Sequence, residues 1–132
     1  MVAAPWATFA FNTATASTVQ ITDAFTIGDR FRLSWTGTSV GFFETGAFGG
    51  VDGAESGIED PDIAFASPLL SKGQAAFGPG NYNMTLSVIR NAAGTTIGGA
   101  FIRATVVPEP STYALLATGL ISLVVVARRR RA

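Results

Sequence analysis

Short stretches in which apolar and polar residues alternate dominate the first 107 residues of this 132-residue chain. In the clearest of them, Phe31, Leu33 and Trp35 are separated by single polar residues. A period of two is typical of strands that bury one face and expose the other. The same alternation recurs in the segments TFAFN (8–12), TVQIT (18–22) and YNMTLSV (82–88). The pattern predicts a body built from sheets.

Turn signals separate these stretches. The segment GTSVG (37–41) predicts a hairpin turn, and GPGN (78–81) predicts a turn before a strand. NAAG (91–94) predicts a type I turn in which Gly94 supplies a positive φ and joins two antiparallel strands. Several short strands with such turns in about 100 residues are typical of a sandwich. We therefore predict an all-β fold, a jelly-roll-like antiparallel β-sandwich over residues 7–106.

Residues 46–62 interrupt the alternation. They are rich in glycine and acidic residues and have little periodicity, so we interpret them as a long surface loop. The segment that follows, up to Pro68, is predicted to form one short helical turn.

An uncharged run and a block of arginines lie at the C-terminal side of the sequence. Residues 114–127 carry no charge and would cover about 21 Å of a roughly 30 Å hydrocarbon core as a helix. With Ser111–Tyr113 the helix reaches about 26 Å, and arginine side chains can extend to the interface. We predict one transmembrane helix at about residues 111–127. The alternative is a buried C-terminal helix of the domain, which a small sandwich has no room to cover.

The arginine block sets the expected topology. Arg128, Arg129, Arg130 and Arg131 should stay in the cytoplasm by the positive-inside rule, where they act as a stop signal, and the body then lies on the other side of the membrane.

Composition excludes several function classes. Residues 1–107 carry five basic and eight acidic side chains, so there is no basic face for nucleic acid. The chain has no Cys and no His, which removes thiol nucleophiles, disulfides and histidine bases. Ser39 in GTSVG matches a nucleophile elbow but lacks a histidine base and lies in a predicted hairpin turn. We expect no enzymatic activity.

Acidic residues gather in the long loop. Carboxylates in such a loop are ligands that calcium prefers, although their spacing does not match an EF-hand. A solvated acidic loop is the competing interpretation, and a glycosidase acid–base pair is a third. The candidate calcium ligands are Asp52, Glu55, Glu59, Asp60 and Asp62.

Aromatic residues could serve a sugar-binding role. Trp35, Phe42, Phe43 and Phe48 could form a platform for a sugar ring, but in strands most of them should belong to the core. Because Phe42 and Phe43 are neighbours in a predicted strand, only one of them can face inward.

The last 26 residues resemble a known signal. Val-Pro-Glu-Pro, a short apolar run and an arginine-rich end follow one another in Val107–Ala132. This order resembles the PEP-CTERM sorting signal of Gram-negative bacteria that make exopolysaccharide. The resemblance implies that Pro108, Glu109 and Pro110 are recognised by an exosortase, a membrane-embedded protease-like enzyme, and that the tail is removed. Both prolines hold the backbone extended and keep it out of a sheet, as a processing site requires.

The resemblance also implies an address. The protein would lie in the inner membrane with its body in the periplasm, and after processing would reach the cell surface or the extracellular matrix of a biofilm. We expect a non-catalytic surface or matrix protein whose partners are an exosortase, the membrane and extracellular polysaccharide. The alternative is a carbohydrate- or calcium-binding module of that matrix. We expect no cofactor other than calcium in that alternative.

The N-terminus and two segments of the body carry weaker signals. Residues 1–6 lack Lys and Arg and contain Pro5, so they are either the end of a signal peptide that starts upstream or a plain N-terminal end. DAFTIGDRF (23–31) and residues 60–86 resemble a recurrent secreted domain often found with such tails. That family often has His where this chain has Tyr82, and its activity is unassigned, so this resemblance implies a fold and an address only.

Overall fold

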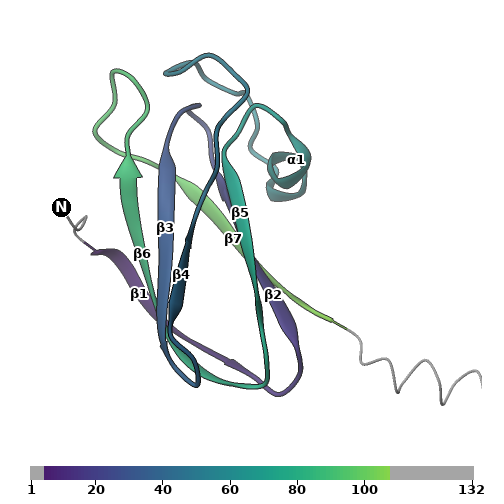
Figure 1. The fold of residues 1–132 in the computed structure, drawn as a ribbon. Helices are drawn as coiled ribbons and strands as arrows, with labels where there is room; N and C mark the ends of the chain where they lie inside the picture. The colour runs from purple at the N-terminus through teal and green to yellow at the C-terminus, as the bar shows by residue number, and fades with distance from the viewer. Residues whose placement is uncertain (1–4, 108–132) are drawn as a thin grey trace, which may run out of the picture.

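A computed structural model describes residues 5–107 of the chain. These residues form seven strands and one short helix (Figure 1). The elements are β1 (Pro5–Thr13), β2 (Ser17–Asp23), β3 (Arg30–Gly37), β4 (Gly41–Glu44), α1 (Pro61–Ala66), β5 (Lys72–Phe77), β6 (Gly80–Arg90) and β7 (Ala100–Val106). Strand β1 begins at Pro5, two residues before the start expected for the domain.

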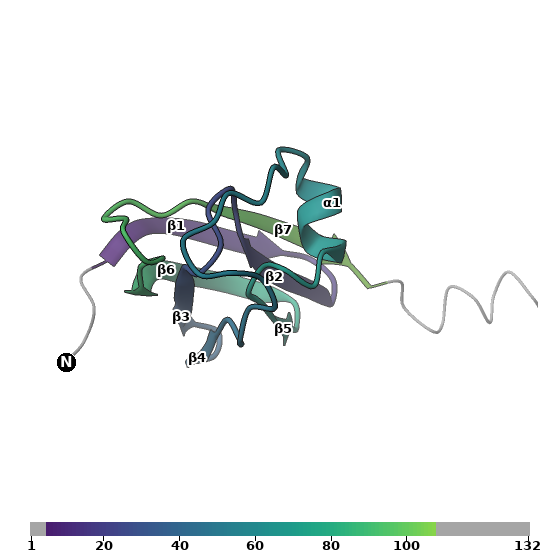
Figure 2. The same ribbon diagram turned by 90° about the horizontal axis from the view of Figure 1, so that it is seen from above.

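The strands form two antiparallel sheets, with the orders β1-β6-β3-β4 and β5-β2-β7. Helix α1 lies outside the second sheet, as the view from above shows (Figure 2). The all-β prediction is therefore confirmed. The described residues form seven strands, one fewer than the eight of a jelly roll, so the jelly-roll comparison stays a prediction.

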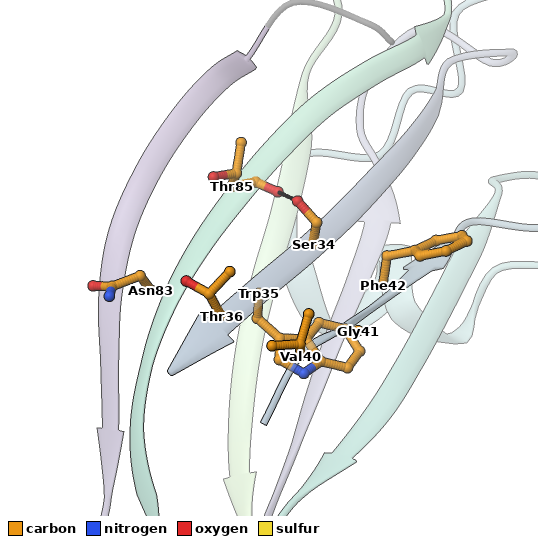
Figure 3. Close-up of a pocket in the computed structure, with 8 residues that line it drawn as sticks. All are labelled: Ser34, Trp35, Thr36, Val40, Gly41, Phe42, Asn83 and Thr85. Carbon is orange, nitrogen blue, oxygen red and sulfur yellow. Dashed lines mark hydrogen bonds between the residues drawn. The ribbon is translucent and has the colours of Figure 1, made fainter. Parts of the chain in front are cut away.

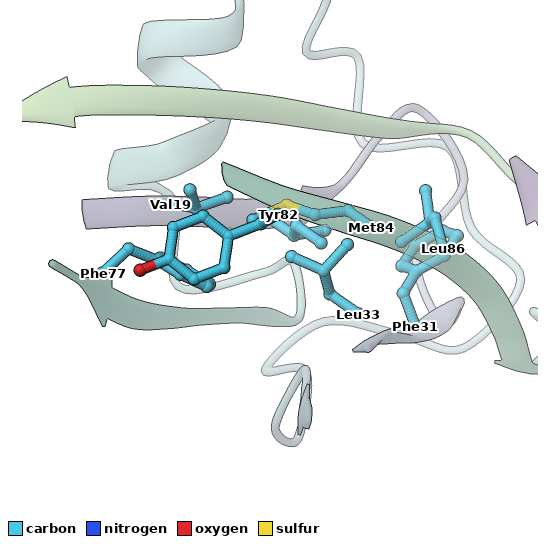
Figure 4. Packing of buried hydrophobic residues seen from close by; sticks show 8 residues of the cluster. Val19, Phe31, Leu33, Phe77, Tyr82, Met84 and Leu86 are labelled. Atoms are coloured by element: carbon cyan, nitrogen blue, oxygen red, sulfur yellow. The ribbon is translucent and has the colours of Figure 1, made fainter. Parts of the chain in front are cut away.

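The core lies between the two sheets (Figure 4). Val19 and Ile21 of β2 pack in one cluster with Phe31 and Leu33 of β3, and each of the four is at most 1% exposed. These are the positions that the period-two alternation assigns to a buried face. Burying each side chain contributes about 1.5–3 kcal/mol, so this face holds the sheets together.

A second, smaller core lies under α1. Ile27, Ala64 and Leu70 are buried there, with Phe48 and Phe101 packed against them. The short helix expected before Pro68 is confirmed. It begins where Asp60 caps it, because the Asp60 carboxylate accepts a 2.8 Å hydrogen bond from the Asp62 amide. Pro61 follows at the start of the helix, where its missing N–H is not needed.

The hairpin turn predicted at residues 37–41 joins β3 to β4, which are paired. Gly37 adopts a φ of +116°, and a Cβ there would lie 2.3 Å from the carbonyl oxygen of Asn81. A glycine is therefore required for both reasons.

The prediction for residues 91–94 is partly wrong. Gly94 has the expected positive φ of +77°. However, β6 and β7 belong to different sheets, so the segment is a crossover and not a hairpin. The amides of Ala92 and Ala93 donate to the carboxylates of Asp29 and Asp52, and these long-range contacts hold the crossover.

The connections gather at two opposite ends of the sandwich, which lie at the bottom and the top of Figure 1. We call one the turn end: it comprises the tight turns at residues 14–16, 38–40 and 78–79, together with Val106 and Val107. We call the other the loop end: it comprises residues 24–29, 45–60 and 91–99.

Candidate functional site

Strand β7 and the residue after it, Val107, end at the turn end of the body. The amide of Val107 donates a 2.8 Å hydrogen bond to the carbonyl oxygen of Ala16, and Val106 is paired with Ser17 of β2. Backbone pairing therefore holds the last strand through Val107. Val106 and Val107 are 61% and 44% exposed, so their side chains remain accessible.

The sequence-predicted sorting residues lie outside the described part of the chain. This applies to Pro108, Glu109 and Pro110, to the predicted helix at 111–127, and to Arg128–Arg131. Between residues 5 and 107, no helix is long and apolar enough to cross a membrane.

Asp52 of the long loop forms an ion pair with Arg90 of β6. Its Oδ1 also accepts a 2.9 Å hydrogen bond from the Ala93 amide. The hydrogen bond from Arg90 lowers the pKa of Asp52 below its ordinary value. Arg90 donates in addition to the carbonyl oxygen of Gly28, so one guanidinium joins three segments of the loop end.

The other candidate calcium ligands have separate positions. Glu55 accepts a 2.9 Å hydrogen bond from the hydroxyl of Thr26, and Asp60 caps α1. Asp62 is exposed and lies 3.6 Å from a guanidinium nitrogen of Arg103. Glu59 is exposed. Within residues 5–107, no three acidic side chains come close enough together to hold a metal ion, and calcium binding stays a prediction.

Two buried carboxylates were not singled out from the sequence. Asp23 is fully buried, and its oxygens accept hydrogen bonds from the amides of Ala24, Gly28 and Asp29 at 2.8, 3.1 and 3.2 Å. Burial raises the pKa of Asp23 to about 7, against the lowering effect of these amides. The carboxylate shapes the loop between β2 and β3.

Asp29 is the second of these carboxylates and is 1% exposed. Its Oδ1 accepts a 2.6 Å hydrogen bond from the Ala92 amide, whereas its Oδ2 has no hydrogen-bond partner among the described residues. Burial raises the pKa of Asp29 as well. The spacing of the two aspartates, on either side of a glycine-containing loop, is the only sequence signal that could have found them.

Ser39 lies in the turn between β3 and β4, as expected. Its hydroxyl oxygen accepts a 3.3 Å hydrogen bond from the indole nitrogen of Trp35, so its partner is a donor and not a base.

The aromatic residues do not form one platform. Phe43 and Trp35 pack against the main core, and the Trp35 ring lies edge-on to Phe77 at 4.7 Å. Phe48 packs in the second core with the Arg90 guanidinium 5.1 Å from its ring. Phe42 alone of the four is largely exposed, at 60%. The prediction that Phe42 and Phe43 face opposite sides is confirmed.

A shallow groove of about 350 Å³ lies on the outer face of the four-stranded sheet (Figure 3). Phe42 and Val40 supply its exposed apolar surface. The polar lining comes from Thr36, Asn83 and Thr85, whose side chains make no hydrogen bond to another described residue, and from Ser34. The Arg32 guanidinium lies 4.8 Å from the centroid of the Phe42 ring. The groove therefore combines uncharged hydrogen-bonding groups with an aromatic ring that has a cation beside it.

Comparison with known protein families concerns the segment that follows β7. Residues 106–131 match the family model described as the PEP-CTERM protein-sorting motif. The chain carries a PEP-CTERM sorting motif. Such a motif implies an exported protein that is anchored at a membrane, processed by an exosortase and destined for the cell surface. No curated protein and no solved structure matches the chain.

The PEP-CTERM motif begins at Val106, which is also the last residue of β7. The sorting segment therefore starts within the folded body, with no linker between them. This continuity places the beginning of the PEP-CTERM motif at the turn end.

Proposed function

We propose that the chain is an exported, non-catalytic surface protein. Residues 111–127 hold it in the inner membrane with its body in the periplasm, and Arg128–Arg131 remain in the cytoplasm. An exosortase recognises Pro108, Glu109 and Pro110 and removes the tail, after which the body reaches the cell surface or the polysaccharide matrix. The match of residues 106–131 to the sorting motif carries this proposal.

The geometry of the body supports a role without catalysis. Ser39 has an indole as its partner, and Asp52 is paired with Arg90. Asp23 is closed off from solvent and accepts hydrogen bonds from three backbone amides. In these arrangements Ser39, Asp52 and Asp23 hold turns and loops in place.

A pair of hosts tests the sorting role. The chain is expressed behind an intact signal peptide in a host that has its exosortase and in the same host with the exosortase gene deleted. We expect a shortened body outside the inner membrane in the first host. We expect the full-length chain in the inner-membrane fraction of the second. A body that leaves the membrane equally in both hosts would overturn the proposal.

A second candidate function is carbohydrate binding, and the outer groove favours it. Sugar rings stack on aromatic faces, and their hydroxyls pair with uncharged groups such as those of Thr36 and Asn83. The groove offers both beside the exposed ring of Phe42. Because the groove lining carries no charged residue, a neutral polysaccharide is the expected ligand.

Binding of the full chain to immobilised neutral polysaccharide tests this second function. Phe42→Ala should weaken retention at least several-fold. Ile63→Ala is the matched control, because Ile63 is exposed to a similar degree, 57% against 60%, but lies on α1. If the polysaccharide retains both variants as well as it retains the unaltered chain, the groove is not a sugar-binding site.

A further inference from the structure

The turn end differs in charge from the rest of the body. Its segments read TATAS (13–17), GTSVG (37–41), FGPGN (77–81) and ATVV (104–107), none of which contains a charged residue. The five acidic residues of the long loop and α1, by contrast, are at or beside the loop end. Arg30, Lys72 and Arg90 also lie at or beside the loop end, and residues 1–107 carry eight acidic and five basic side chains. The body therefore has one uncharged end and one charged end, at which acidic side chains are in excess.

Apolar side chains are exposed at both ends of the body, among them Val51 and Ile97 at the loop end, but only at the turn end do they lie among uncharged residues. Val40 is 79% exposed at the tip of the β3–β4 turn. Val106 and Val107 are 61% and 44% exposed beside the β1–β2 turn. The three turns are held together, because Thr13 pairs with Gly80 and the Thr38 amide donates a 3.0 Å hydrogen bond to the Asn81 carbonyl. The three turns thus form one connected surface.

The length of chain beyond Val107 limits how far this end can lie from a membrane. Seven residue steps separate Val107 from Ala114, where the uncharged run begins. Even fully extended, they span at most about 25 Å. If the transmembrane helix starts at Ser111, the four remaining steps span at most about 14 Å. The polar layer of a bilayer is only about 5–8 Å thick on each side.

Charge decides which way the body faces. Acidic side chains are repelled by anionic lipid headgroups, whereas an uncharged surface with exposed valines can enter the interfacial layer. Strand β6 has 11 residues and is therefore about 36 Å long, so an upright body keeps the loop end far from the lipids.

We propose that the turn end rests against the bilayer surface while the tail is in place. The side chain of Val40 lies in the interfacial layer, and the acidic loop end points away from the membrane. This inference rests on the proposed membrane tether. It adds an orientation: the sorting motif leaves the body on the side that faces the lipids, so an enzyme must approach the motif from beside the body.

Single-cysteine labelling tests the orientation in the full chain. The chain contains no Cys, so each variant carries one environment-sensitive fluorophore. Val40→Cys reports on the turn end, and Val51→Cys, at 74% exposure in the long loop, is its matched control. Ala14→Cys reports on a second turn of the turn end. The proteins are placed in vesicles of neutral and anionic phospholipids that contain headgroup spin-labelled lipid.

We expect the labels at positions 40 and 14 to be quenched several-fold more than the label at position 51. Equal quenching at 40 and 51 would overturn the orientation. A Ser122→Cys label and acyl-chain spin-labelled lipid separate this failure from failure of the tether. If the label at position 122 is quenched and the label at position 40 is not, the membrane tether is supported and the proposed orientation is wrong. No quenching at 122 overturns both.

Discussion

The backbone amide of Val107 donates a 2.8 Å hydrogen bond to the carbonyl oxygen of Ala16. Val107 is the residue immediately before Pro108, the first proline of the sorting triplet. The sheet is thus complete up to the point where processing is proposed to occur. An enzyme that binds Pro108–Pro110 must therefore work directly beside a folded domain.

Distance between the body and the triplet should control the rate of processing. Inserting a six-residue Gly-Ser linker between Val107 and Pro108 moves the body away, so we expect faster tail removal in pulse-chase labelling. The same linker inserted in the long loop after Gly57, where the backbone is exposed, serves as the control. An unchanged rate with the first insertion would show that the body does not crowd the enzyme.

Stability should fall as the pH rises from 5 to 8. The pKa of Asp23 is about 7 in the folded protein and 3.8 ordinarily, so the folded state holds this proton more tightly than the unfolded chain does. The stabilisation is complete below pH 3.8 and is lost as the pH rises to about 7. Between pH 5 and 7 the loss is roughly 2–3 kcal/mol, at about 1.4 kcal/mol per pH unit. The raised pKa of Asp29 acts in the same direction.

Urea unfolding at pH 5 and pH 8 measures this effect. Asp23→Asn removes the titrating group, so its stability should change less between the two pH values than that of the unaltered chain. It should also be less stable at pH 5, because an amide nitrogen in place of one carboxylate oxygen would meet the backbone N–H donors. Identical pH profiles for the two proteins would rule out Asp23 as the source.

The two phenylalanines Phe31 and Phe42 should respond very differently to truncation. Phe31 is fully buried and stacks on Trp6 with 5.9 Å between ring centroids. Phe31→Ala should lower the free energy of unfolding by about 3–5 kcal/mol. Phe42→Ala, on the outer face, removes mainly the contact with the Arg32 guanidinium, 4.8 Å from the ring centroid, and should lower it by only about 0.5–1 kcal/mol. Comparable losses measured by chemical denaturation would contradict the assigned strand register.

Arg90 should control the order of the loop end. Arg90→Ala removes the partner of Asp52 and a donor to the Gly28 carbonyl, so we expect faster proteolytic cleavage within residues 45–60. Arg32→Ala is the matched control, since Arg32 also pairs with a carboxylate, that of Glu44, but between adjacent strands. The two variants should differ in where they are cut, which peptide mapping reveals.

Strands β1, β2, β3 and β6 were predictable because each carries its own alternation, whereas β5, Lys72–Phe77, has none and was not predicted. Phe31, Leu33 and Met84 occupy the buried positions that their alternation assigns, and Gly37 and Gly94 adopt the positive φ values that their turns require. These features depend on neighbours in sequence, so the sequence pattern alone identifies them.

Pairing between distant segments was not predictable. The crossover after β6 is set by Asp29 and Asp52, which lie 63 and 41 residues from the amides they bind. The spacing of Asp23 and Asp29 around a glycine-containing loop marks the pair, but it does not indicate that Asp23 is buried while Glu59 is exposed. The partners of Asp52 and Glu55, which are Arg90 and Thr26, likewise come from other parts of the chain.

The most direct test of the central claim is the intact mass of the mature body from a host with its exosortase. We expect a protein that ends at or beside Pro108–Pro110 and lacks Arg128–Arg131. A chain with the triplet replaced by Ala-Ala-Ala should reach the membrane and keep its full length. A mature protein that retains the four arginines, or a triplet variant trimmed to the same end, would contradict the account.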